Sequence, residues 1–384
     1  MATPGSKEDE AGGRRAPRDA RAPVRVCIVA PSLDILGGQA IQAQRLLDAF
    51  AGSERVHAEF LAVNPRLPGP LRALQRIKYV RTIVTAIAYF SSLLARTRDY
   101  EVLHVFSASY WSFLLGPLPA LLVARLYGRP TLLNYRSGEA SDHLANWRTA
   151  RWGVRQATSV IVPSGYLVGV FGAFGVTAKA VANFVDLSRI RFRERAALRP
   201  VFLSNRNFDA LYNVSCTLRA FATIQARVPG ATLTVVGDGP QRAQLRALAA
   251  SLGLRNVVFT GRIAPDEMPA QYDNADIYLN SPDIDNMPTS IIEAFAAGLP
   301  VVTTDAGGIP FIVRHGDNGR MVARDDAAAL AVEACALLAD PDGALAMARR
   351  ARAECESRYV WTAVRAQWEE LYRETANRAP GTRP

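Results

Sequence analysis

Residues 280–310 read NSPDIDNMPTSIIEAFAAGLPVVTTDAGGIP and predict a strand, a polar loop, a helix and a second strand. We expect the first strand to end at Asn280 and the helix to begin near Thr289. Gly298 would end the helix, and the second strand would cover residues 301–303. This order of elements is typical of a parallel sheet covered by helices.

Short apolar strands alternate with helical segments in two blocks along the chain. In the first block we predict strands at 24–30, 58–63, 102–106, 131–135 and 159–163. In the second block we predict strands at 201–204, 232–236, 257–260, 277–280 and 301–303. The Arg-rich stretch 187–200 separates the blocks. The pattern therefore predicts an α/β protein with two Rossmann-like, doubly wound sheets facing each other.

The composition fits two domains and excludes several classes of site. The chain has 384 residues, of which 49% are hydrophobic. Its four cysteines are widely spaced without a CxxC pair, and none of its four histidines forms an HExxH pattern. We therefore expect neither a disulfide scaffold nor a metal site. The charged, Pro/Gly-rich leader 1–23 lacks the apolar stretch of a signal peptide, so we predict disorder there and a cytoplasmic location.

The net charge of +10 resides in the first half of the chain. Residues 1–190 carry 23 Lys and Arg against 13 Asp and Glu, whereas residues 191–384 carry 22 of each sign. The first half would face an anionic partner, such as a membrane surface or an acidic acceptor, unless the charge is only a solvated surface. Nucleic acid is disfavoured, because no basic run is interleaved with aromatic residues.

Two apolar segments, 102–128 and 71–98, are long enough to be considered for contact with a membrane. Residues 102–128 contain glycine and proline, so we predict a strand, a loop and a helix instead of a membrane span. Residues 71–98 join basic positions to an apolar stretch. They indicate either an interfacial helix on anionic lipid or a helix packed on the sheet with its cationic side in water.

The loop and helix within residues 280–310 carry the candidate chemistry. The helix start at Thr289 would offer unpaired N–H groups to a phosphate or sugar oxygen. Asp285 and Glu293, eight residues apart, would accept hydrogen bonds from hydroxyls of a sugar or ribose. The alternatives are helix capping for Thr289 and Asp285 and a solvated helix face for Glu293.

This segment resembles the signature of the family-4 retaining glycosyltransferases of the GT-B fold. The family pattern is a glutamate, seven residues and a second glutamate, and here Asp285 replaces the first glutamate. Further family segments follow in order: VPSGYL (162–167), NFVD (183–186), VVGDGPQRAQL (235–245), FTGRI (259–263), YDNADIYLNSP (272–282) and HGDNGRMV (315–322). The resemblance implies that Glu293 holds the nucleotide ribose. Asp285 would hold the donor sugar together with its neighbours Asn286, Met287, Pro288, Thr289 and Ser290.

Glycines supply two further candidate contacts. Gly37 and Gly38 match the family's glycine-rich loop near the donor diphosphate, where a bare backbone comes close to phosphate, and Gln39 occupies a position of polar contact. Gly237 and Gly239 would turn the chain at the edge of the nucleotide pocket. The third glycine of a dinucleotide fingerprint is missing there, which disfavours an NAD enzyme.

The resemblance also implies cationic groups for the diphosphate. Arg206 occupies the position of the family's phosphate-clamping arginine, but Leu211 stands where the family usually has a lysine. We expect Arg206 to act with Arg262 or with amides near Asn205.

On the acceptor side, Arg136 occupies a position where members of the family commonly have a histidine. It would stabilise negative charge on the leaving phosphate. His104 and His143 are interpreted as structural, and Glu139 is a further candidate in the cleft.

The sequence thus predicts an acceptor-side domain at 24–187 and a nucleotide-sugar domain at 188–360. A helix at 361–376 would cross back, and a disordered tail would follow at 377–384. The expected activity is metal-independent, retaining transfer of a sugar from a UDP- or GDP-sugar to a glycan or lipid-linked acceptor, without a cofactor. The alternatives are a silent GT-B binding module, and an epimerase or phosphorylase on the same fold. Peripheral contact with the inner membrane face would accompany a lipid-linked acceptor.

Overall fold

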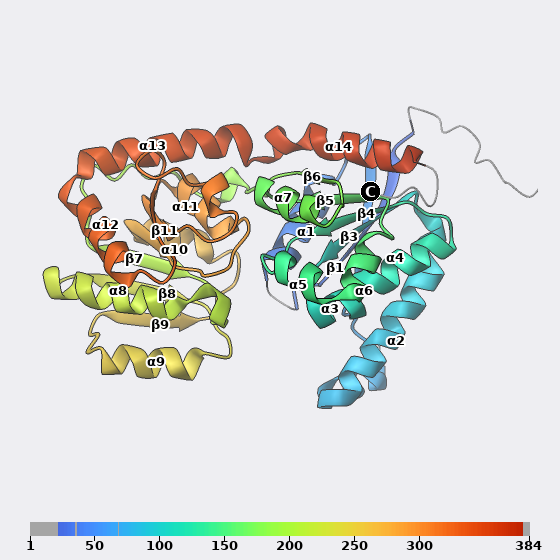
Figure 1. Ribbon diagram of the computed structural model, residues 1–384, viewed down its shortest axis with the longest axis horizontal. Coiled ribbons are helices and arrows are strands. Elements are labelled where there is room, and N and C mark those ends of the chain that lie inside the picture. Colours follow the sequence, from blue (N-terminus) through green and yellow to red (C-terminus); the bar gives the residue numbers. More distant parts are fainter. Residues whose placement is uncertain (1–21, 35–36, 68, 379–384) are drawn as a thin grey trace, which may run out of the picture.

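The computed structural model describes residues 22–34, 37–67 and 69–378, which form two α/β domains side by side (Figure 1). The leader predicted at 1–23 and the tail predicted at 377–384 lie almost entirely outside these residues. The first domain holds a parallel sheet in the order β2-β1-β3-β4-β5-β6. Its strands are β1 (Val24–Ala30), β2 (Val56–Ala62), β3 (Val102–Ser107), β4 (Thr131–Tyr135), β5 (Ser159–Val162) and β6 (Ala178–Ala180).

The second domain repeats this architecture with a parallel sheet in the order β12-β11-β10-β7-β8-β9. Its strands are β7 (Val201–Asn205), β8 (Thr232–Val236), β9 (Val257–Gly261), β10 (Ile277–Asn280), β11 (Val301–Thr304) and β12 (Arg320–Val322). The two sheets confirm the predicted α/β class. Neither β6 nor β12 was predicted, because a three-residue edge strand is too short to show a period of two.

Helices cover both faces of the first sheet, so its strands are buried on each side. They are α1 (Gly38–Ala49), α2 (Lys78–Arg96), α3 (Tyr110–Leu115), α4 (Pro117–Leu126), α5 (Ala140–Asn146), α6 (Arg148–Val154) and α7 (Gly165–Ala173). Short 3-10 turns flank them at η1 (Gly69–Arg76) and η2 (Thr97–Asp99). Residues 102–128 form β3, α3 and α4, as the interruptions by glycine and proline indicated.

The second sheet is likewise covered on both faces. Its helices are α8 (Val214–Arg227), α9 (Arg242–Ser251), α10 (Met268–Asn274), α11 (Thr289–Ala297), α12 (Ala327–Ala339) and α13 (Pro341–Arg358). The 3-10 turns η3 (Leu187–Arg189), η4 (Ala210–Tyr212) and η5 (Ile309–Phe311) lie in its connections. Across the described residues, none of the helices combines the length and hydropathy needed to span a bilayer.

The last helix, α14 (Trp361–Asn377), returns to the first domain (Figure 1). Its buried residues Val364, Trp368, Leu371 and Tyr372 belong to the hydrophobic cluster of the first sheet. The Tyr372 hydroxyl lies 2.7 Å from Nδ1 of the buried His104 on β3. The chain therefore crosses between the domains twice, and α14 packs on the first sheet.

Candidate active site

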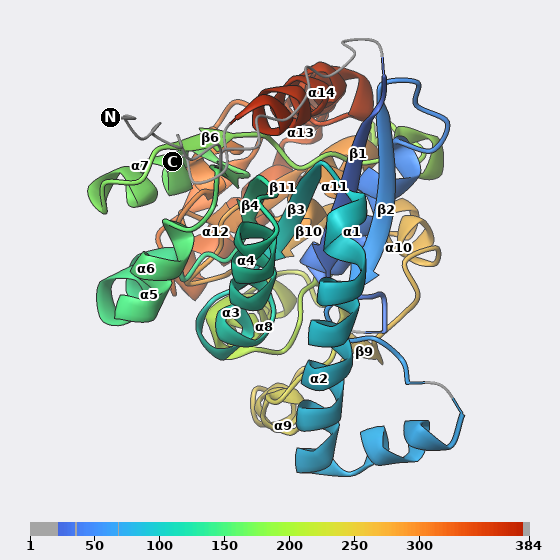
Figure 2. The same cartoon turned by 90° about the vertical axis from the view of Figure 1, so that its right-hand side faces the viewer.

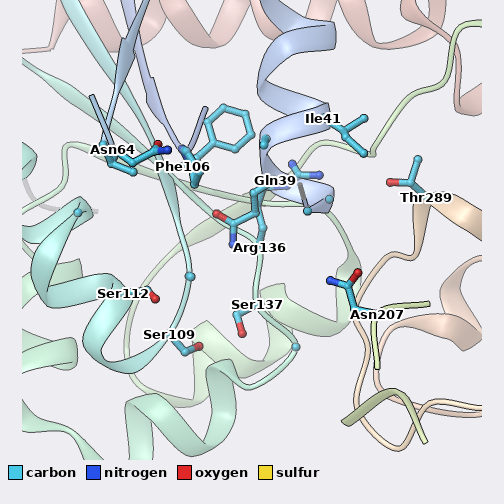
Figure 3. A pocket seen from close by; sticks show the side chains of 18 of the residues that line it. Gln39, Ile41, Asn64, Phe106, Ser109, Ser112, Arg136, Ser137, Asn207 and Thr289 are labelled. Carbon is cyan, nitrogen blue, oxygen red and sulfur yellow. The ribbon is translucent and has the colours of Figure 1, made fainter. Parts of the chain in front are cut away.

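A cleft of about 1290 Å³ lies between the two domains, at the carboxyl ends of strands from both sheets. In Figure 3, Gln39, Arg136 and Ser137 of the first domain face Thr289 and Asn207 of the second. This edge is where ligands bind in open α/β sheets, because loops leave the strands and helices begin there. Fourteen of the predicted site residues line the cleft: Gly37, Gly38, Gln39, Arg136, Asn205, Arg206, Gly237, Arg262, Asp285, Met287, Pro288, Thr289, Ser290 and Glu293.

Two predicted donor-site residues, Gly239 and Asn286, lie outside the lining of the cleft. A Cβ atom at Gly239 would come within 2.9 Å of the Phe208 backbone, so this glycine packs under the loop that follows β7. The Asn286 side chain is buried and accepts a hydrogen bond from Ser164 of the first domain. Both residues therefore shape the cleft from behind it.

Gly237 needs to be a glycine because of how closely two loops approach. Its φ of +147° lies where side chains are rarely accommodated, and a Cβ atom would meet the Arg206 carbonyl at 2.0 Å. The Arg206 amide in turn donates to the carbonyl of Val236 at 3.1 Å. This contact fixes the end of β7, from which Arg206 projects.

Arg206 is held on several sides within the second domain. One terminal nitrogen pairs with the Asp285 carboxylate, and the other donates to Ser290 Oγ at 3.2 Å. The guanidinium carbon lies 4.0 Å from the centre of the Tyr212 ring. Its Nε is buried and has no hydrogen-bond partner among the described residues. Arg206 is thus fixed in position, with one buried N–H group that has no acceptor among the described residues.

The Asp285 carboxylate, which the resemblance assigned to the donor sugar, forms an ion pair with Arg206. Burial raises the pKa of Asp285, and the charge of Arg206 opposes this shift. The Asn286 amide also donates to Asp285 Oδ1 at 2.8 Å. In this arrangement Asp285 orients the arginine, and sugar hydroxyls would have to share its remaining lone pairs.

Glu293 joins the two domains. One of its oxygens accepts from Arg45 Nη2 of α1 at 2.6 Å, and the other accepts from the Tyr272 hydroxyl at 2.7 Å. Burial and the charge of Glu293 raise the pKa of Tyr272 well above its ordinary value, so this hydroxyl remains a donor. The Asn205 side chain donates to the same hydroxyl at 2.8 Å. A ribose hydroxyl would find a preoriented carboxylate here.

Arg136 extends from the end of β4 into the cleft. It donates to the Asn183 and Asn134 side chains and lies 5.5 Å from the centre of the Phe106 ring. Within the described ranges, no carboxylate lies at ion-pair distance from it, and burial lowers its pKa to about 9. An anion in the cleft would supply the missing counter-charge.

Asn183 connects Arg136 to the loop that precedes α11. Its side chain accepts from Arg136 and donates to the carbonyl of Met287 at 2.7 Å. The Asn183 amide also lies 3.2 Å from the Met287 sulfur. Arg136 and the loop that precedes α11 are therefore connected through one side chain.

The start of α11 presents backbone donors to the cleft. Pro288 precedes the helix, and Thr289 and Ser290 form its first turn. In the described part of the chain, neither of their amides has a hydrogen-bond partner. These amides and the positive end of the helix dipole favour an anionic group.

The position of the missing lysine is occupied by Leu211, which lines the cleft. The exposed Arg262 after β9 also lines it, and no ion pair engages Arg262 within the described ranges. Arg262 is therefore a cation available to an anionic ligand in the cleft.

The remaining candidates separate into structural and cleft residues. His104 contacts Tyr372 and Asn134, and His143 contacts Tyr135, and neither histidine lines the cleft. Burial lowers the pKa of His104 to about 3 and that of His143 to about 4, so both are neutral. Glu139 does line the cleft, and burial followed by repulsion from Asp142 raises its pKa.

Arg45, Tyr272 and Asn183 were missed as site residues. Arg45 lies seven residues after Gly38 on the same helix, so the helical period could have indicated a common face. Tyr272 and Asn183 lie inside the quoted segments YDNADIYLNSP and NFVD. No local pattern singled them out, because their roles come from partners far along the chain.

Comparison with known proteins shows that part of this chain is similar to glycosyltransferases. Residues 199–340 match the family described as glycosyl transferases group 1. A GDP-mannose-dependent alpha-(1-6)-phosphatidylinositol monomannoside mannosyltransferase of Mycobacterium tuberculosis is 30% identical over 194 residues, 48% of this chain and 50% of that protein. A glycogen synthase of the same species is 27% identical over 66% of this chain and 65% of its own length. The chain thus spans about half the length of the mannosyltransferase it matches.

Solved structures show the fold. A sucrose-phosphate synthase from Thermosynechococcus elongatus superposes with a TM-score of 0.74 at 21% identity, over 91% of this chain and 98% of that one. HepE of Anabaena, solved in complex with UDP and glucose, gives a TM-score of 0.71 at 19% identity, over 91% of this chain and 100% of that one. The two parallel six-stranded sheets are those of the GT-B fold, as predicted.

Proposed function

We propose that this chain, whose residues 199–340 match the group 1 glycosyl transferases, is a retaining, metal-independent enzyme. It would transfer a sugar from a nucleoside-diphosphate donor to an acceptor hydroxyl. One observation carries the proposal: Arg206, Arg136 and the free amides at the start of α11 converge on one inter-domain cleft. Together they provide positive charge where a leaving diphosphate would develop negative charge.

We assign different parts of the donor and the acceptor to different residues of the cleft. The Glu293 carboxylate would accept from the ribose hydroxyls, and Tyr272 would keep it oriented. The diphosphate would lie against the amides of Thr289 and Ser290 within reach of Arg206 and Arg262. The acceptor would approach from the side of Arg136, Ser137 and Glu139.

In the proposed transfer, the bond between the anomeric carbon and the diphosphate oxygen breaks while the acceptor oxygen attacks from the same face. The acceptor proton passes to the diphosphate oxygen that leaves. Arg136 cannot act as the base, but its charge would stabilise the leaving group. Catalysis would then rest on positioning and electrostatic stabilisation within the cleft.

The test is a panel of UDP- and GDP-sugars with measurement of donor hydrolysis and transfer in the presence of EDTA. We expect turnover with at least one donor and the same anomeric configuration in donor and product. Loss of activity on chelation would contradict metal independence, and an inverted product would contradict retention. Nucleotide binding without turnover would instead favour the silent binding module.

The acceptor is proposed to be a glycan precursor or a lipid-linked alcohol at the cytoplasmic face of a membrane. The positive charge of residues 1–190 supports this choice, since anionic lipid headgroups attract basic surfaces. The named mannosyltransferase relative acts on a phosphatidylinositol monomannoside, which is a lipid acceptor. Comparing transfer to lipid-linked and water-soluble alcohols tests this part separately.

A further inference from the structure

Helix α2 carries a row of exposed apolar side chains. Ile83 and Ile87 are each 61% exposed, and Phe90 is 47% exposed. They follow one another at spacings of four and three residues, so they lie on one face of the helix. Tyr79, four residues earlier, is exposed as well. We call Ile83, Ile87 and Phe90 the α2 stripe.

The opposite face of α2 has a different environment. Arg81 and Thr85 lie about half a turn away from the stripe, and both line the inter-domain cleft. Farther along the helix, Tyr89 and Leu93 are buried in the hydrophobic cluster of the first domain. The helix is therefore anchored at one end and overhangs the cleft at the other, with its apolar stripe turned outward.

The segment that contains the stripe is basic. The segment 60–98 contains seven Lys and Arg and no Asp or Glu. Two of these, Arg66 and Arg96, pair with Asp34 and Glu59. Arg72 and Arg76 of η1 are exposed, and in the described part of the chain neither forms an ion pair with a carboxylate. A helix with an apolar face and unpaired cations close to its start is typical of a helix that lies in a membrane interface.

The segment before α2 is held against it. Gln75 of η1 donates to Thr85 Oγ1 at 3.1 Å and to the Pro65 carbonyl at 2.9 Å, and its own side-chain oxygen accepts from the Leu67 amide at 3.1 Å. Figures 1 and 2 show α2 reaching beyond the sheet on the side away from α14. Gln75 thus ties η1, which carries Arg72 and Arg76, to the cleft-facing side of the projecting part of α2.

The rim of the cleft continues this apolar character. Trp111 and Leu115 of α3 are exposed and line the cleft, as does Ala86 of α2. These apolar side chains therefore lie at the first-domain side of the cleft, where the acceptor is proposed to enter.

We propose that η1 and α2 form the docking surface for an anionic phospholipid bilayer, with the stripe inserted among the lipids and Arg72 and Arg76 on the headgroups. The cleft-facing side of the same helix would then receive the hydroxyl of a lipid-anchored acceptor. This second step rests on the proposed function, whereas bilayer binding does not.

Co-sedimentation with vesicles tests the docking surface without donor or acceptor. The wild-type chain binds vesicles of phosphatidylcholine and phosphatidylglycerol, and binds pure phosphatidylcholine much more weakly. The double variant Ile83→Glu/Ile87→Glu weakens binding by at least about 10-fold, because two apolar groups no longer insert. Arg72→Glu/Arg76→Glu has a similar effect and removes most of the salt dependence.

The matched control is Val258→Glu/Val332→Glu, which places the same charges at exposed valines of the second domain and leaves binding unchanged. Donor hydrolysis by the stripe variant stays at the wild-type rate and shows that the variant is folded. Failure of the wild-type chain to bind anionic vesicles would overturn the docking surface, even if sugar transfer is found. Vesicle binding without any donor turnover would instead overturn the proposed function alone.

Self-association is the other outcome that would refute the proposal. If a second copy covers the stripe, sedimentation velocity shows a dimer that Ile83→Glu dissociates, and vesicles do not compete with it. Monomeric wild-type chain that binds anionic vesicles supports the docking surface.

Discussion

Arg206 and Arg136 balance their charges in different ways. Arg206 has Asp285 as its ion-pair partner, whereas Arg136 is surrounded by asparagine side chains and a phenylalanine ring. A cation that loses water without gaining a carboxylate is costly, and burial accordingly lowers the pKa of Arg136 to about 9. We infer that Arg136 is kept for the anion that it meets during the reaction.

The variant Arg136→Met should therefore lower sugar transfer by about 100-fold, the usual effect of removing one donor to developing negative charge. Its melting temperature should change by only a few degrees, because the apolar side chain still packs against Phe106. Steady-state kinetics and thermal melting measure the two effects.

Arg246→Met is the control, since Arg246 also lies over a phenylalanine ring, 5.2 Å from the centre of Phe259, but outside the cleft. Its activity should equal that of the wild-type chain. A fully active Arg136→Met variant would remove Arg136 from the proposed mechanism.

At the scale of elements, α14 is held on the first sheet by a buried polar contact. His104 lies between Tyr372 of α14 and Asn134 of β4, with Phe106 and Trp368 packed against its ring. Burial, and secondarily the charge of Arg136, lower the pKa of His104 to about 3. The folded protein thus keeps this imidazole neutral where the unfolded chain would protonate it.

This pKa shift predicts how the free energy of unfolding depends on pH. The pKa of His104 in the folded protein lies below its value of about 6.5 in the unfolded chain. The contribution of neutral His104 to the free energy of unfolding is therefore complete above pH 6.5 and is lost as the pH falls towards 3. Between pH 7 and pH 5 the loss from His104 should be about 2 kcal/mol. Urea unfolding of the wild-type chain and His104→Gln at both pH values measures it, and the variant should lack this part of the pH dependence.

Tyr372→Phe separates the hydrogen bond from the titration. It removes the hydroxyl contact but leaves the imidazole buried, so it should lower the free energy of unfolding by a similar amount at both pH values. Equal pH dependence in the wild-type chain and His104→Gln would contradict the assignment.

At the scale of the whole molecule, the ion pair between Arg45 and Glu293 connects the two domains across the cleft. The side chains are 21% and 14% exposed, and Gln42 of the same helix reaches Thr289 at 3.4 Å. A partly exposed pair of this kind contributes up to about 1 kcal/mol. That amount changes the ratio of closed to open molecules by about 5-fold.

Arg45→Gln should therefore open the cleft in the absence of nucleotide, and a nucleoside diphosphate should close it again. Small-angle X-ray scattering would show a larger radius of gyration for the variant without nucleotide. Arg55→Gln is the control, because the pair of Arg55 with Glu369 lies within the first domain and α14. Identical scattering by wild-type chain and Arg45→Gln would show that the pair does not hold the domains together.

The local sequence patterns predicted more of the fold than of the site. Alternating apolar strands and helices were sufficient for ten of the strands and for the order of the elements, because burial and hydrogen bonding act within short segments. The segment 280–310 likewise indicated the strand end, the loop and the start of α11. These features depend on residues that are near one another in the chain.

The sequence by itself therefore determined two parallel sheets, the family resemblance and the loops that carry the candidate residues. Only the tertiary structure decided which side chains meet: Arg45 with Glu293 over 248 positions, Asn183 with Met287 over 104, and Arg206 with Asp285 over 79. It also placed Gly239 and Asn286 behind the cleft. Local periodicity cannot specify such pairs, because they depend on how the two domains pack and on which buried charges find partners.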